Sequence, residues 1–264
     1  MTYQLLEPQK NMANSAFCRL CQKAPAIKKS HVLSRFLWKQ SGLAHRKDNK
    51  GYDLVIKDDP RLIKRNQRAG ITEALFCPDC EDKRNKLETY MSGVLYEYEA
   101  IIRRTSSGHQ LIDGLCYQRV KLFTMFNLFA MGISSYPYYS AVNLGDHHTD
   151  CLRSMLLASD PGEPWQYSSI WLRLKIGGQP IEGISLAPHR IRWGETGQHV
   201  YRTIFAGVCW MTFCSSHRHP WLSEPAFIGK AGQLALFDTP TNELPFLAGR
   251  INEWITANRH AQHH

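Results

Sequence analysis

The chain of 264 residues lacks any hydrophobic run long enough to cross a membrane. Its most apolar run, Val120 to Ile133, is 14 residues long and contains Asn127. A transmembrane helix needs about 20 apolar residues, so we expect a buried helix here and no membrane partner. The first residues also lack the pattern of a secretory signal, which favours a cytoplasmic, reducing location where disulfides are rare.

Several motifs of common enzyme classes are absent as well. The sequence has no P-loop, no G-x-G-x-x-G dinucleotide loop and no G-x-S-x-G nucleophile elbow. It also has no internal repeat and no low-complexity tract. With 43% hydrophobic residues the chain is typical of a globular protein that can bury a core.

Acidic residues are scarce in one part of the chain. Residues 17–90 carry 17 Lys and Arg against 9 Asp and Glu, a surplus of eight that accounts for nearly all of the net charge of +9. Lys and Arg that neutralise phosphates supply most sequence-independent affinity for nucleic acid. We therefore expect a nucleic-acid partner, although a basic surface that only contacts solvent is the alternative. The candidate contacts are Lys28, Lys29, Arg35, Arg46, Lys64, Arg65 and Arg68.

Two C-x-x-C pairs lie in this basic part. Cys18 and Cys21 form the first pair, and Cys77 and Cys80 form the second. Each pair can present two thiolates to one metal, and structural zinc takes four such ligands. The sequence therefore predicts one structural zinc ion held by all four cysteines. Two disulfides or free thiols are the alternative, which the expected reducing location disfavours.

The segment between and after these pairs resembles the zinc-containing HNH endonucleases. Their pattern reads C-x-x-C, (Glu/Asp)-His-(Ile/Val)-(Ile/Leu)-Pro, C-x-x-C-Asn and a later Glu; here Ser30-His31-Val32-Leu33-Ser34 and Cys77-Pro78-Asp79-Cys80-Glu81 stand in register. The resemblance covers residues 15–92. It implies a treble-clef (ββα-metal-like) head, cleavage of nucleic acid, most often DNA, and the phage or defence contexts in which such heads occur.

The resemblance also implies catalytic roles. His31 matches the general base, while Glu81 and Glu88 match positions that could hold a catalytic Mg²⁺ or Mn²⁺. Three positions depart from the pattern: Ser30 replaces the acidic residue, Ser34 the proline and Glu81 the asparagine. A packed or zinc-bound imidazole is the alternative for His31, and a solvated or bracing carboxylate is the alternative for Glu88.

The rest of the chain predicts an α+β fold, with the zinc head at 15–92 joined by a long helix to a larger domain at 93–264. We expect a short hairpin within 17–38, a strand at 52–56, and helices at 79–104, 117–134, 146–158, with Asp146 as N-cap, and 244–258. Strands are expected at 170–176, 181–193, 199–213 and 226–237 in an antiparallel sheet. The stretch 121–157 resembles the C-terminal part of uncharacterised bacterial and phage proteins with the same head, which implies no activity.

Three functions remain open from the sequence. The first is a metal-dependent HNH-type endonuclease. The second is a zinc-containing nucleic-acid-binding protein without a catalytic metal. The third is a protein-interaction module in which zinc only stabilises the fold. A protein partner could bind residues 93–264. Only the first function needs His31, Glu81 and Glu88 to meet around a second metal.

Overall fold

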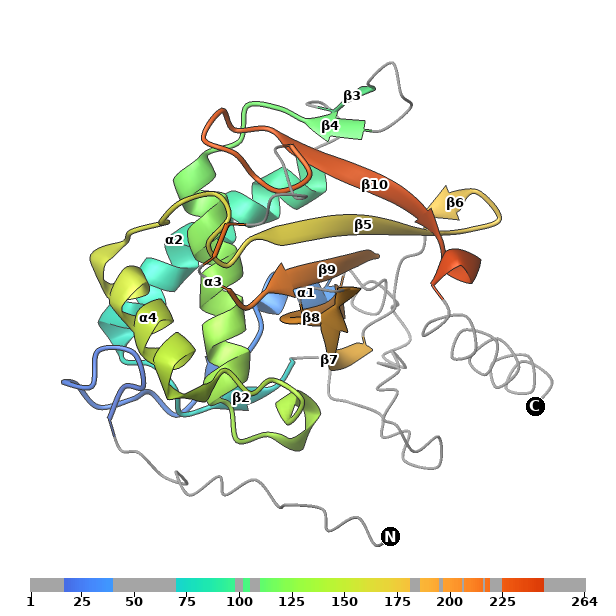
Figure 1. The fold of residues 1–264 in the computed structure, drawn as a ribbon. Helices are drawn as coiled ribbons and strands as arrows, with labels where there is room; N and C mark the ends of the chain where they lie inside the picture. The colour runs from blue at the N-terminus through green and yellow to red at the C-terminus, as the bar shows by residue number, and fades with distance from the viewer. Residues whose placement is uncertain are drawn as a thin grey trace, which may run out of the picture.

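A mixed eight-stranded sheet forms one layer of the protein, and helices pack on it (Figure 1). The computed structural model describes residues 17–39, 70–97, 102–104, 110–180, 186–194, 197–205, 207–215, 217–218 and 225–244. The strands are β3 (Ile102–Arg104), β4 (Gln110–Ile112), β5 (Ser169–Ile176), β6 (Gln179–Pro180), β7 (Leu186–Trp193), β8 (Gln198–Phe205), β9 (Val208–Phe213) and β10 (Leu234–Pro240). Their order is β3-β4-β10-β5-β9-β8-β7, with β6 beside β5.

The sheet confirms the α+β class but corrects several expectations. β10 runs parallel to β5, so the sheet is mixed rather than antiparallel. The run 199–213 forms two strands, β8 and β9, because the chain turns at Gly207, whose φ of 71° suits glycine. β10 begins at Leu234 rather than at 226, after a turn in which a Cβ on Gly232 would lie 2.3 Å from the Leu115 carbonyl oxygen.

Three long helices cover the sheet. They are α2 (Pro78–Glu97), α3 (Tyr117–Ile133) and α4 (Gly145–Ala158). α3 is the middle helix and packs against both of the others (Figure 1), and every residue from Val120 to Met131 is buried. Its Phe123 ring packs 6.0 Å from the Trp210 ring of β9. The apolar run of the sequence is therefore the central core helix, as predicted.

The ends of two helices differ from expectation. The predicted helix to Arg104 is α2, which ends at Glu97, and Ile102–Arg104 instead pair as β3 with β4. The β-branched Ile102 lies opposite Ile112, a pairing that favours the strand. Asp146 lies in the first turn of α4, whose N-cap is Leu144 without a side-chain cap.

The head is built on two very short strands. β1 (Ser30–His31) pairs antiparallel with β2 (Thr72–Glu73), so the hairpin expected within 17–38 is wrong. Residues 35–39 form the short helix α1 (Arg35–Lys39). Among the residues the structure describes, the short helices Pro137–Tyr139 and Thr241–Glu243 complete the elements. The strand expected at 52–56 and nearly all of the helix expected at 244–258 lie outside the described residues.

One hydrophobic cluster joins the head to the rest. It includes Cys18 and Leu75 of the head, Phe126 of α3 and Leu234 of β10. The boundary expected between 92 and 93 falls inside α2. None of the described helices is both long and apolar enough to span a bilayer.

A buried lysine in α3 makes the stability of the fold depend on pH. The Lys121 side chain donates hydrogen bonds to the carbonyls of Pro164 and Gln166, and burial lowers its pKa from 10.5 to about 7. Between these values the unfolded chain binds the proton and the folded chain does not. This lysine therefore makes the fold more stable as pH rises from 7 to 10.5.

We predict that Lys121→Met flattens the rise in stability between pH 7 and 10. Denaturant unfolding of wild type and variant at several pH values measures the slope. Lys230→Met is the control, because it removes an exposed lysine, paired with Glu163 at the surface, rather than a buried one. An unchanged slope in Lys121→Met would show that other groups cause the pH dependence.

Candidate metal centre and the adjoining polar network

The four cysteines of the two C-x-x-C pairs meet in space. The Sγ atoms of Cys18, Cys21, Cys77 and Cys80 all lie within 4.8 Å of one another. The Cys21 and Cys77 sulfurs are 3.7 Å apart. A tetrahedral zinc with Zn–S bonds of about 2.3 Å separates its sulfurs by about 3.8 Å, whereas a disulfide needs about 2.05 Å. All four are free cysteines, so this cluster fits a metal ion and the disulfide alternative does not hold.

The first pair sits in a tight turn closed by its own backbone. The Cys21 amide donates to Cys18 Sγ at 3.4 Å, and the Cys18 amide donates to the Ala24 carbonyl at 2.7 Å. Gln22 completes the turn with a φ of 59°, a conformation that costs a side-chain-bearing residue about 1–2 kcal/mol. The turn directs both thiols of the pair to one side, as a metal ligand pair requires.

Backbone hydrogen bonds bring the second pair to the first. The Arg19 amide donates to the Leu75 carbonyl at 2.7 Å, and the Ile27 amide donates to the Phe76 carbonyl at 2.8 Å. Cys77 immediately precedes α2 and Cys80 lies in its first turn, where Pro78 is well placed. The positive end of the helix dipole favours thiolates at this position.

The thiols differ in acidity. Burial acts to raise the pKa of Cys21, but hydrogen bonds from the Lys23 and Ala24 backbone and from the Cys18 and Cys77 thiols lower it to about 6. Burial raises the pKa of Cys77 and, more strongly, that of Cys80. A metal must displace protons from these two thiols, so metal affinity falls as pH falls.

The three residues expected to form a catalytic site do not form a second such group. Among the described residues, the four cysteines are the only set of three or more His, Cys, Asp and Glu close enough to share a metal. His31 ends β1 and is partly exposed. Glu81 is partly buried, and its Oε1 has no hydrogen-bond partner. Glu88 forms an ion pair with Arg84, with Oε1 and Nε 2.8 Å apart.

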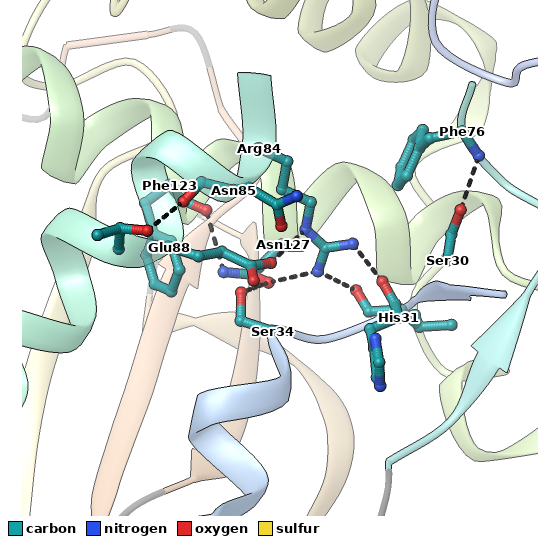
Figure 2. A network of polar contacts seen from close by, with 11 residues as sticks. Ser30, His31, Ser34, Phe76, Arg84, Asn85, Glu88, Phe123 and Asn127 are labelled. Atoms are coloured by element: carbon teal, nitrogen blue, oxygen red, sulfur yellow. Dashed lines mark hydrogen bonds and ion pairs between the residues drawn. The ribbon is translucent and has the colours of Figure 1, made fainter. Parts of the chain in front are cut away.

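Arg84 is the centre of a buried polar network that the sequence did not reveal. Its guanidinium donates to the His31 carbonyl, to the Val32 carbonyl at 3.1 Å and to Asn127 Oδ1 at 3.4 Å. Only 1% of the residue is exposed. Figure 2 shows the guanidinium among these groups, with the imidazole of His31 pointing away from it. Arg84 therefore ties β1, α2 and α3 together.

Ser30 and Ser34 stand at two of the positions that differ from the family pattern, and both form hydrogen bonds in the same region. The Ser30 hydroxyl accepts a hydrogen bond from the Phe76 amide at 3.1 Å, and the Ser34 hydroxyl donates to Asn127 Oδ1 at 3.3 Å. Asn127 is the only amide in the apolar run of α3, and it was the one sequence signal for this network. Nothing in the sequence around Arg84 marks it as buried.

Three of the seven expected nucleic-acid contacts can be placed. Lys28, Lys29 and Arg35 are exposed. Arg46, Lys64, Arg65 and Arg68 lie outside the described residues.

Comparisons with known proteins found no match to this chain. No protein-family model, no curated protein and no solved structure is similar to it.

We predict about one zinc ion per chain in protein purified without chelator. Cys77→Ser should lose the metal and expose the head to protease, because binding energy at such sites, about 10–16 kcal/mol in small zinc domains, is also folding energy. Elemental analysis and limited proteolysis measure both effects. Cys116→Ser, which removes an exposed thiol away from the cluster, is the control. Wild-type protein without metal would contradict the assignment.

Two ion pairs of α2 with the same spacing allow a second test. Arg84 is buried and its partner Glu88 is half-buried, whereas both partners of the Lys86–Asp82 pair, also 2.8 Å apart, are exposed. Arg84→Ala leaves two carbonyls and a carboxylate without their partner, and should destabilise the protein by about 3–5 kcal/mol. Lys86→Ala should change stability by less than about 1 kcal/mol. Urea unfolding compares them, and similar losses would mean that the buried network does not hold the head.

Proposed function

We propose that this protein is a nucleic-acid-binding protein, with DNA as its ligand, whose HNH-like head is held by structural zinc and lacks a catalytic metal. The observation that carries the proposal is the buried Arg84 guanidinium. It is bound to the backbone of His31 and Val32 and paired with Glu88.

The treble-clef assignment of the head draws support from the order of its parts. A cysteine turn is followed by β1 and β2, and the second cysteine pair then opens α2. A zinc ion on the four thiols would be a closed structural site with no open coordination position. It would hold the head together and supply no reaction chemistry.

The positive charge of Arg84 opposes a catalytic metal at this site. An arginine stays protonated in proteins, and Arg84 is buried where solvent screens its charge poorly. A divalent ion beside His31 would be repelled by this guanidinium. The ion would also compete with Arg84 for the Glu88 carboxylate. Ser30, at the acidic position of the family pattern, is already hydrogen-bonded to the backbone.

The exposed cations of the head support binding to a polyanion. Lys28 and Lys29 lie between the first cysteine pair and β1, and Arg35 opens α1. The segment 40–69, between α1 and β2, adds eight Lys and Arg against four Asp and Glu. Contacts between such cations and phosphates give affinity for nucleic acid that does not depend on base sequence.

A second candidate function is the HNH-type endonuclease itself, and one observation favours it. The Glu81 Oε1 atom is buried without a hydrogen-bond partner, which is an expensive state for a carboxylate unless an ion or water binds it. Glu81 would then hold Mg²⁺ or Mn²⁺, and His31 would activate the water.

We predict that duplex DNA binding weakens steeply with salt. Changing Lys28, Lys29 and Arg35 together to Gln should lower affinity for all sequences and reduce the slope of log K against log salt by about two to three, given about 0.9 per phosphate contact. Fluorescence anisotropy measures this. The matched control changes Arg103, Arg192 and Lys230, three exposed cations elsewhere, to Gln. No binding by wild type at low salt would refute the proposal.

We also predict that metal-loaded protein leaves plasmid intact in Mg²⁺ or Mn²⁺, as His31→Ala does. Gel analysis of DNA and RNA substrates checks this. Cleavage by wild type that disappears in both His31→Ala and Glu81→Ala, with zinc content and DNA binding retained, would instead establish the endonuclease.

A further inference from the structure

A cleft of about 530 Å³ opens between α2, α3 and the C-terminal end of α4. This volume falls within the range of about 300–1,000 Å³ that is usual for small-molecule sites. Neither the four cysteines nor His31 lines the cleft. It is therefore separate from the candidate metal centre.

Four residues of the cleft lining are apolar, and they are called its apolar floor here. Leu87 of α2, Leu122 and Phe126 of α3, and Leu156 of α4 contribute to it. The Phe126 ring is held edge-on against Phe76, with centroids 5.1 Å apart. A rigid apolar surface of this kind offers van der Waals contact to a flat ring system.

Three cations and no carboxylate line the same cleft: Lys83, Lys86 and Arg119. The Lys83 ammonium donates to the Leu157 carbonyl at 3.3 Å, and the Arg119 guanidinium lies 5.2 Å from the centre of the Tyr90 ring. Both contacts hold a charge in place and leave further donors available. The Lys86 ammonium forms an ion pair with Asp82, so Lys83 and Arg119 are the stronger anion ligands.

Neutral polar side chains complete the lining. Thr89, Gln118 and Ser159 also line the cleft. The Gln118 amide is fixed by donating to the Ser159 carbonyl at 2.9 Å, and the Thr89 hydroxyl keeps acceptor capacity after donating to the Asn85 carbonyl. A purely aliphatic anion could not use the remaining hydrogen-bonding capacity of these groups, whereas a nucleobase has a polar edge that can use it.

We propose that this cleft binds a nucleoside 5′-phosphate, with the base on the apolar floor and the phosphate at Lys83 and Arg119. The inference rests on the cleft alone and does not require the DNA contacts proposed above. The nucleotide is either free or an unpaired residue of a strand, since both present the same base and phosphate.

The test is titration calorimetry of the whole zinc-loaded protein with adenosine 5′-monophosphate. The double variant Lys83→Gln, Arg119→Gln should bind it about tenfold more weakly or worse, because each charged hydrogen bond contributes strongly. The matched control, Arg103→Gln with Lys230→Gln, removes two exposed paired cations elsewhere and should bind as wild type does. Thr89→Trp fills the cleft without changing its charge and should also lose binding.

Three further probes make the outcome decisive. Adenosine, ribose 5-phosphate and hexyl phosphate should each bind more weakly than the nucleotide. Adenosine lacks the phosphate, ribose 5-phosphate lacks the base, and hexyl phosphate has an aliphatic chain without a polar edge. A short oligodeoxyadenylate that displaces the nucleotide more effectively than the free compound identifies a strand as the ligand, and the reverse result identifies the free nucleotide. No binding at millimolar concentration, undiminished binding by the Lys83–Arg119 variant, or tighter binding of hexyl phosphate would overturn the proposal.

Discussion

The burial of one guanidinium governs how the head of this protein is attached. A buried guanidinium is a charge removed from water, so Arg84 must find partners inside the protein. It finds them on three elements: the β1 backbone, Glu88 on its own helix, and Asn127 on α3. The rings of Phe76 and Phe126 lie 5.8 and 5.5 Å from its central carbon. None of these elements can move without leaving part of the network unsatisfied.

The cysteine cluster and this network support each other because α2 carries both. Two strands of two residues each contribute few hydrogen bonds, so the β1–β2 pair needs outside support. The cysteines hold one end, where the backbone joins Arg19 to Leu75. Arg84 holds the other end, one turn beyond Cys80. Glu88, which the family pattern offers as a metal ligand, takes part in this bracing through its ion pair with Arg84.

The sequence predicted what depends on local pattern. Cysteine spacing identified the four residues of the candidate metal centre. A long apolar run identified α3, and hydrophobic periodicity identified α4 and β5. It missed what depends on distant partners: the pairing of β1 with β2 across a long insertion, the parallel pairing of β10 with β5, and the burial of Arg84. A charged residue in a helix is normally solvated. Arg84 is removed from water by contacts with β1, Phe76 and α3, which are distant in sequence. Asn127 indicated that a polar partner lies nearby, because a buried amide in an apolar helix needs a hydrogen-bond partner.

The most direct test of this account is a crystal grown with zinc and soaked in Mn²⁺, with anomalous scattering recorded for each metal. The account predicts a zinc peak between the sulfurs of Cys18, Cys21, Cys77 and Cys80, no manganese peak at His31, Glu81 or Glu88, and the Arg84 guanidinium in place on the His31 carbonyl. A manganese ion bound by Glu81 or Glu88 beside the His31 imidazole, with Arg84 displaced, would contradict it.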